Sequence, residues 1–134
     1  MGRNWIEDKA IQNAIELSGL NSFLNTIPGG LDYILSDKGK SLSRGQMPSI
    51  ALARAIAGNP ELLLLDEPTA SLDINSEKEL LENLNLGEFK TIVVVTHRMS
   101  MLELVDRIIV LSNGSVVLDG EKDEVLMKLR QKND

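Results

Sequence analysis

Two unbroken apolar runs constrain this chain more than any other feature of its sequence. Leu62–Leu65 and Ile92–Val95 are continuously apolar rather than alternating, a pattern typical of strands buried on both faces of a parallel sheet. The residues between them, 75–86, have the spacing of an acidic amphipathic helix. The sequence therefore predicts a strand–helix–strand unit within an α/β fold.

Further elements are expected on both sides of this unit. Asn113-Gly114 predicts a tight hairpin turn, and Gly58-Asn59-Pro60 is expected to end a helix. Residues 31–40 are expected to be irregular. The other expected helices cover residues 6–17, 20–27, 46–57, 100–105 and 121–131, and the other expected strands cover residues 107–111 and 116–119.

Composition limits the classes of function. The 134 residues suffice for one domain, and the absence of Cys excludes disulfides, thiol catalysis and cysteine-based zinc sites. The net charge of -6 argues against a partner with a phosphate backbone. No apolar run approaches the ~20 residues that cross a bilayer, and residues 1–10 lack the apolar core of a signal peptide. These features predict an acidic, soluble, cytosolic domain.

Ser43-Arg44-Gly45-Gln46 opens the predicted helix 46–57 and is the first candidate binding motif. Ser43 and Gln46 have the spacing of a capping box. A helix N-terminus carries about +0.5 elementary charge and attracts anions, and Gly45 would let a phosphate approach the backbone closely. A well-capped helix without a ligand would show the same residues, so the motif gains weight only from its neighbours.

Two acids and a histidine follow the apolar runs. Asp66 and Glu67 are expected at the carboxyl edge of the sheet, where open α/β sheets bind ligands. One carboxylate can hold Mg²⁺ through water, and the other can orient or deprotonate an attacking water. His97, the single histidine, is expected at the same edge, where it can donate to a phosphate oxygen. The alternative interpretation is that Asp66 and Glu67 are solvated acids at a strand end and that His97 is a surface residue without a catalytic role.

Gly39-Lys40-Ser41 imitates the end of a phosphate-binding loop. The first glycine of G-x-x-x-x-G-K-[ST] should stand at position 34, which is Ile34, and no apolar strand leads into the segment. The sequence therefore contains no loop that could hold the phosphates of its own nucleotide. Arg54 is interpreted as a charge on a helix surface.

Taken in order, these motifs resemble those of the nucleotide-binding domain of ATP-binding cassette (ABC) transporters. The similarity extends from Asp8 to Leu129, and four motifs in order are highly specific. Leu42–Gln46 is similar to the signature motif, usually Leu-Ser-Gly-Gly-Gln, Leu62–Glu67 to the Walker B strand, Ser71–Asp73 to the D-loop and His97 to the switch histidine.

The resemblance implies a partial P-loop NTPase (RecA-like) core with part of the ABC helical subdomain. Residues 1–57 would form the helical subdomain and signature helix, and residues 58–134 the second half of the core. The Walker A half, with the adenine-stacking aromatic and the Q-loop, would be missing from this chain. In such a sheet the Walker A strand lies between the strand ending at His97 and the strand starting at Arg107. Its unpaired neighbours predict a marginal, oligomeric or partner-dependent chain.

The resemblance also implies ATP and Mg²⁺ as cofactors and a second nucleotide-binding domain, paired head to tail, as a partner. Ser43 and Gly45 would contact nucleotide bound by that partner. Arg44, Gln46 and Asp73 would also bind the cofactor. Asp66 would hold Mg²⁺ through water, and Glu67 and His97 would be catalytic.

Thr96-His97-Arg98 and residues 99–129 resemble exporters, most closely type I secretion and peptide exporters. This implies an ATPase that couples hydrolysis to export, acts with a transmembrane domain and lies on the cytoplasmic face of the inner membrane. A non-hydrolytic module that pairs with a complete domain is the alternative. A DNA-acting cassette ATPase is disfavoured by the charge of -6. Two residues depart from the family pattern. Arg44 replaces the first signature Gly, and Pro48 removes the helical bond to the carbonyl of Arg44 and risks a kink.

Overall fold

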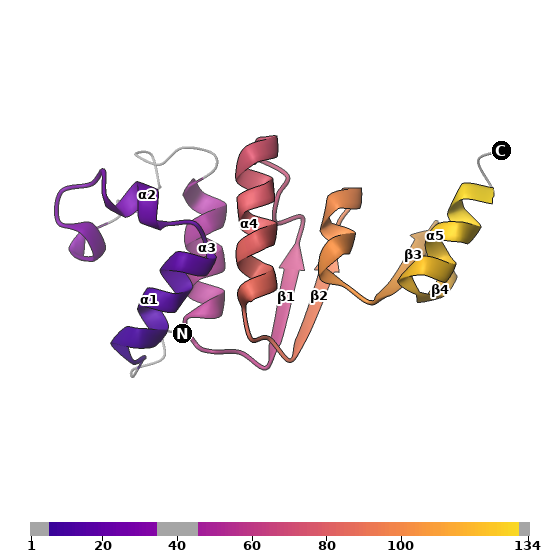
Figure 1. The fold of residues 1–134 in the computed structure, drawn as a ribbon, viewed down its shortest axis with the longest axis horizontal. Helices are drawn as coiled ribbons and strands as arrows, with labels where there is room; N and C mark the ends of the chain where they lie inside the picture. Colours follow the sequence, from indigo (N-terminus) through magenta and orange to yellow (C-terminus); the bar gives the residue numbers. More distant parts are fainter. Residues whose placement is uncertain (1–5, 35–45, 132–134) are drawn as a thin grey trace. The chain divides into compact units, whose positions relative to one another are not determined.

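The computed structural model describes residues 6–34 and 46–131 of the chain. It divides into two compact units, one ending at Val95 and one beginning at Thr96, shown in sequence colours in Figure 1. The first unit contains α1 (Asp8–Leu17), α2 (Asn21–Leu24), η1 (Gly30–Asp32), α3 (Gln46–Ile56), β1 (Leu62–Asp66), α4 (Ile74–Leu86) and β2 (Thr91–Val95). The second contains η2 (Met99–Leu104), β3 (Arg107–Ser112), β4 (Ser115–Glu121) and α5 (Lys122–Gln131).

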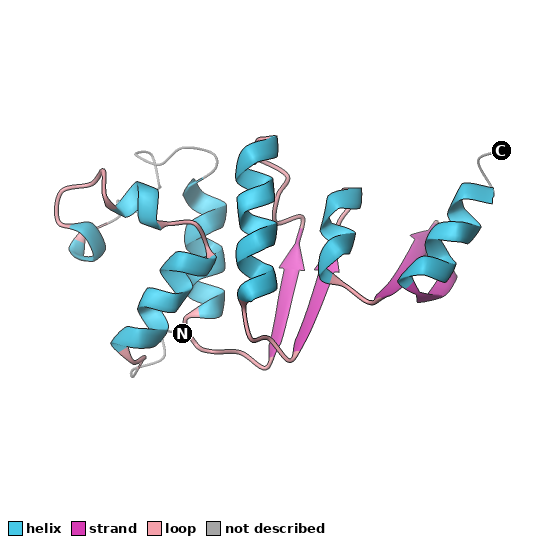
Figure 2. Ribbon diagram, viewed as in Figure 1, coloured by secondary structure: helices cyan, strands magenta, loops and turns pink. Residues whose placement is uncertain are grey.

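The predicted strand–helix–strand unit is present. Strands β1 and β2 pair in parallel, from Leu62 opposite Thr91 to Asp66 opposite Val95, and α4 connects them. Figure 2 shows the two arrows side by side and pointing the same way. Where the two strands begin, the backbone N–H of Thr91 donates to the carbonyl oxygen of Glu61, the residue before β1, at 3.0 Å. Both strands therefore end at one edge, as a parallel crossover requires.

The expectation that these strands are covered on both faces is wrong for the described residues. Leu63 is 2% exposed, whereas Leu64, its neighbour on the opposite face, is 65% exposed. An apolar run permits burial on both sides, but covering elements decide which side is buried, and the helices of this unit cover one face. The uncovered surface, called here the bare face, consists of Leu62, Leu64, Val93 and Val95.

The helical part of the first unit packs around α1. Ile15, Leu20 and Ala53 form a buried apolar cluster. The side-chain Nδ2 of Asn83 on α4 donates to the carbonyl oxygen of Glu16 at 3.3 Å, which ties the end of α1 to α4. The helix expected over residues 20–27 is present only as the shorter α2. The segment 31–40, expected to be irregular, begins within the short helix η1. The predicted division of the chain near residue 58 stays a prediction.

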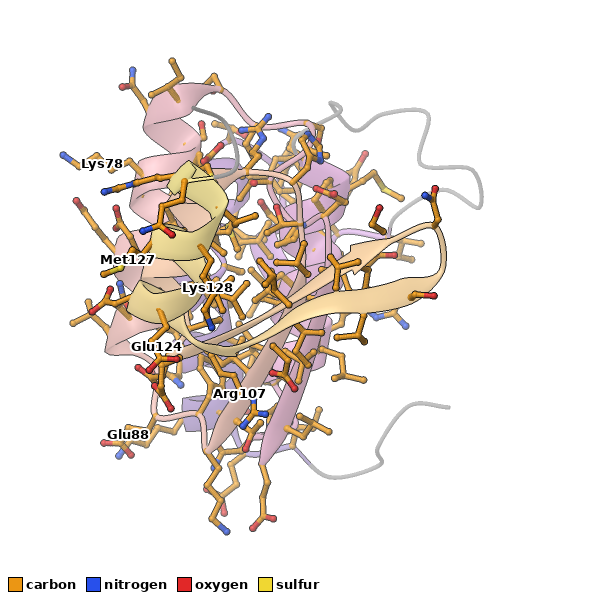
Figure 3. The ribbon with its side chains drawn as sticks, turned by 90° about the vertical axis from the view of Figure 1, so that its right-hand side faces the viewer. Lys78, Glu88, Arg107, Glu124, Met127 and Lys128 are labelled. Carbon is orange, nitrogen blue, oxygen red and sulfur yellow. The ribbon has the colours of Figure 1, made fainter. Side chains whose placement is uncertain are left out.

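The second unit is a hairpin with a helix. Strands β3 and β4 pair antiparallel around Asn113 and Gly114, whose φ angles are 50° and 75°. Positive φ at both positions is what the predicted Asn-Gly hairpin turn requires. Val125 of α5 is fully buried, while Figure 3 shows Glu124, Met127 and Lys128 on this helix. No helix within residues 6–34 and 46–131 is both long and apolar enough to cross a membrane.

Candidate functional site

The two acids at the end of β1 are held in different ways. Asp66 is the last residue of the strand and is exposed, and Glu67 is half-buried. The backbone N–H of Glu67 donates to the carbonyl oxygen of Val95 at 2.8 Å, and its φ is 45°. A left-handed conformation costs an L-residue roughly 1–2 kcal/mol, and such strain is typical of functional sites. The chain therefore turns sharply at the candidate catalytic residue.

The segment after Glu67 is a tight, internally bonded turn. The N–H of Ala70 donates to the carbonyl of Glu67 at 3.1 Å, and the N–H of Leu72 to the carbonyl of Thr69 at 3.0 Å. The side chain of Thr69 is 0% exposed. Among the described residues its hydroxyl has no hydrogen-bond partner. The turn is thus anchored by a buried side chain at its centre.

The start of α3 borders the two acids. A cleft of about 280 Å³ is lined by Pro48 and Ser49 of α3 together with Asp66 and Glu67. Gln46, the first residue of α3, lines an adjacent cleft of about 500 Å³, which Ser49 also borders. The described residues do not include Ser43, Arg44 and Gly45. They also do not include the segment Gly39-Lys40-Ser41. The structure thus brings the described start of α3 close to the end of β1.

Pro48 does not interrupt α3. The described helix begins at Gln46 and continues to Ile56, so Pro48 stands in its first described turn. The first four N–H groups of a helix have no intrahelical partner, which makes proline tolerable there. The helix continues through Pro48 to Ile56, and a kink at Pro48 stays a prediction.

Asp73 is the N-cap of α4. Its Oδ1 accepts hydrogen bonds from the N–H groups of Asn75 and Ser76, both at 3.0 Å, and its Oδ2 accepts one from Ser76 Oγ at 2.7 Å. These bonds, those from Ser76 foremost, hold the pKa of the Asp73 carboxyl below its usual value. Ser76 was not identified from sequence, since Asp-x-x-Ser departs from the usual capping box with Glu or Gln at its end.

His97 belongs to the second unit. It is exposed, and the N–H of Arg98 donates to Thr96 Oγ1 at 3.0 Å, closing a turn around it. Its predicted position on the same edge as Asp66 and Glu67 stays a prediction.

Metal binding would draw on few side chains of this chain. In the part of the chain that the structure describes, no group of three or more His, Cys, Asp or Glu is arranged to hold a metal ion. Mg²⁺ commonly keeps several waters and uses one or two carboxylates together with phosphate oxygens. The exposed Asp66 carboxylate at the strand end fits such a role.

Known proteins resemble this chain over most of its length. It is 45% identical over 112 residues to the glutathione/L-cysteine transport system ATP-binding/permease protein CydC of Bacillus subtilis (strain 168), covering 83% of this chain and 20% of CydC. It is 36% identical over 114 residues to the alpha-hemolysin translocation ATP-binding protein HlyB of Escherichia coli, covering 84% of this chain and 16% of HlyB. The chain thus spans about a fifth or less of these relatives.

A solved structure and a family model agree with these relatives. The structure of a bacterial Atm1-family ABC exporter with ATP bound matches with a TM-score of 0.82 and 28% identity, covering 95% of this chain and 23% of that chain. The predicted α/β fold, part of an ABC nucleotide-binding domain, is confirmed by this match. The family model described as ABC transporter matches residues 3–70. This chain belongs to the ABC transporter family.

Proposed function

We propose that this chain is part of an ABC exporter ATPase and supplies one side of two ATP sites formed at a head-to-tail domain interface. Asp66 and Glu67 serve the nucleotide of their own domain. Ser43, Arg44, Gly45 and Gln46 serve the nucleotide held by a second domain. ATP hydrolysis at these sites drives export through a transmembrane partner at the cytoplasmic face of the membrane.

The observation that carries this proposal is the arrangement around Glu67. Its backbone is held in a left-handed conformation by the hydrogen bond to Val95. The cleft beside it is shared by Asp66 and by the first turn of α3. A carboxylate whose backbone is fixed at the carboxyl end of a parallel sheet is suited to orient or deprotonate a water that attacks a phosphate. Leu63 and Leu65 are buried, and their packing fixes β1, the strand that leads to Glu67.

The cofactors of this proposal are ATP and Mg²⁺. The Asp66 carboxylate would hold the metal through water, and when bound the metal would neutralise charge on the phosphate oxygens. His97, as a neutral imidazole, would donate a hydrogen bond to a terminal phosphate oxygen. The sequence of this chain contains no phosphate-binding loop, so the nucleotide phosphates need a Walker A loop supplied by other residues.

The test is ATPase activity of the chain alone and mixed with a cassette half that carries a Walker A loop. We expect no turnover alone and turnover in the mixture. Glu67→Gln should reduce that turnover by about 10²- to 10⁴-fold, the usual range for loss of a general base. Glu82→Gln is the matched control, because Glu82 is an exposed acid paired with Lys78 at 3.8 Å on α4.

The non-hydrolytic interaction module is the competing outcome. It rests on the absence of a phosphate-binding loop from the sequence. No turnover in the mixture, together with retained binding to a complete nucleotide-binding domain, would favour that module and contradict the ATPase. Turnover unaffected by Glu67→Gln would also contradict the proposed role of Glu67.

A further inference from the structure

We propose that Asp73 and Ser76 together form a positioning device, which holds the segment from Glu67 to Asp73 and thereby the candidate catalytic carboxylate. This inference rests on the proposed function and deepens it. It gives Ser76 a role in the reaction, and it assigns Asp73 a role through α4 rather than through direct contact of its charge with nucleotide or metal.

Both oxygens of Asp73 are engaged with α4. Oδ1 accepts from two backbone N–H groups at 3.0 Å, and Oδ2 accepts from Ser76 Oγ at 2.7 Å. The main-chain carbonyl of Asp73 also accepts from the N–H of Glu77 at 2.9 Å. Four hydrogen bonds therefore join one residue to the first turn of α4, and the carboxylate is oriented along the helix start.

Backbone hydrogen bonds follow the segment from the end of β2 to Leu72, the residue before the cap. Val95 accepts from Glu67, Glu67 accepts from Ala70, and Thr69 accepts from Leu72, with donor–acceptor distances of 2.8, 3.1 and 3.0 Å. The segment is thus fixed at one end by β2, at its centre by the buried Thr69 side chain and at its other end by α4. Without the cap, the end of the segment next to α4 would lose its attachment to the helix start.

The cap also forms part of the wall beside the signature helix. Ser71, Asp73 and Ser76 line the cleft of about 500 Å³ that Gln46 and Ser49 border from α3. Because the cap sets where α4 begins, it sets the position of this wall. A change at the cap can therefore alter the shape of this cleft without any contact between the Asp73 charge and a ligand.

A neutral isostere separates the two roles of Asp73. Asparagine keeps an oxygen that accepts from both N–H groups, and its amide donates to Ser76 Oγ, which can accept. It therefore preserves the cap and removes the charge. Asp73→Ala removes both the cap and the charge. Asn75→Ala is the matched control, because Asn75 contributes only its backbone N–H to these hydrogen bonds.

The experiment measures kcat and KM for Mg-ATP in the full chain mixed with a Walker A-containing half, for Asp73→Asn, Asp73→Ala, Ser76→Ala, Ser76→Thr and Asn75→Ala. We expect Asp73→Ala to lower kcat by about 2- to 30-fold, the fold-change that corresponds to the full stability contribution of a capping side chain. KM should stay within about twofold, since binding groups are untouched. Asp73→Asn, Ser76→Thr and Asn75→Ala should stay near wild type, with Ser76→Ala between them and Asp73→Ala.

Two results would overturn the assignment. Equal loss in Asp73→Asn and Asp73→Ala would show that the charge itself is required, and wild-type kcat in Asp73→Ala would show that the cap positions nothing. Amide exchange of Asn75 and Ser76, followed by NMR, tests the cap separately: exchange should accelerate in Asp73→Ala and not in Asp73→Asn. If the wild-type mixture does not turn over, the proposed function has failed, and unchanged exchange in Asp73→Ala would then reject the cap as well.

Discussion

The backbone N–H of Glu67 donates to the carbonyl oxygen of Val95 at 2.8 Å, which joins the ends of two parallel strands at a residue whose φ is 45°. This hydrogen bond extends the pairing of β1 and β2 one residue beyond the strand. The chain then leaves the sheet in a conformation that glycine would adopt without strain. The strained backbone therefore lowers stability at the residue proposed to orient the attacking water.

Replacing Glu67 should reveal that strain. Glu67→Ala and Glu67→Gly both remove the side chain, but only glycine relieves the positive φ. We expect the glycine variant to be more stable than the alanine variant by up to about 1 kcal/mol, the reverse of the usual order. Urea unfolding of the two variants measures the difference. A more stable alanine variant would mean that the left-handed conformation is not kept in solution.

The two faces of β1 should respond differently to truncation. Leu63→Ala removes a buried side chain and should lower the free energy of unfolding by about 2–5 kcal/mol, whereas Leu64→Ala, on the bare face, should cost less than about 1 kcal/mol. Chemical denaturation measures both variants on the same strand. An equally large cost at Leu64 would show that the bare face is covered in solution.

The bare face should promote self-association. Leu64 and Val93 are directly opposite each other on it and are both exposed, and apolar sheet surfaces next to unpaired edges associate readily. We expect sedimentation of the chain to show oligomers that Leu64→Lys disperses. Leu86→Lys is the control, since Leu86 is exposed on α4 away from this face. A concentration-independent monomer with a sharp cooperative melt would contradict this prediction.

The buried hydroxyl of Thr69 should be dispensable for stability. It has no hydrogen-bond partner among the described residues, so Thr69→Val removes an unsatisfied polar group at nearly constant shape. We expect the free energy of unfolding to stay equal or to rise by about 1 kcal/mol. Thr26→Val is the comparison: Thr26 Oγ1 donates to the carbonyl of Phe23 at 2.7 Å, and its loss should destabilise. A marked loss in Thr69→Val would indicate a bound water at the hydroxyl.

The cross-strand ion pair of the hairpin should show in the titration of Asp119. Arg107 Nε and Nη2 donate to the two carboxylate oxygens of Asp119 at 2.9 and 3.0 Å, and these bonds lower the pKa of Asp119. A lowered pKa contributes stability that is fully present above the unfolded value of about 3.8 and is lost as pH falls through the folded value.

NMR titration of the full chain measures this effect directly. The pKa of Asp119 should lie below 3.8 in the wild type and return toward it in Arg107→Gln. Because both side chains are largely exposed, added salt should weaken the shift. A wild-type pKa of Asp119 that Arg107→Gln leaves unchanged would mean that the ion pair is not formed.

Several features of the fold follow from local sequence. The apolar runs and the amphipathic segment between them specify a strand–helix–strand unit, and Asn113-Gly114 specifies the hairpin turn, because each depends on a few adjacent residues. The family, too, is evident from the order of short motifs. Asp66 stands at the end of β1, as the apolar run before it predicts, while the roles of the site residues stay predictions.

Other features depend on residues far apart in the chain, and only the tertiary structure decided them. Leu63 and Leu64 are the same residue type in one run, and packing by helices from elsewhere determines which of them is buried. The left-handed backbone of Glu67 depends on Val95, a residue of another strand. The sequence by itself determined which elements form and where the acids stand along the chain, because local patterns encode both. The tertiary structure decided which faces are covered and which backbone groups meet, because those are set by long-range contacts.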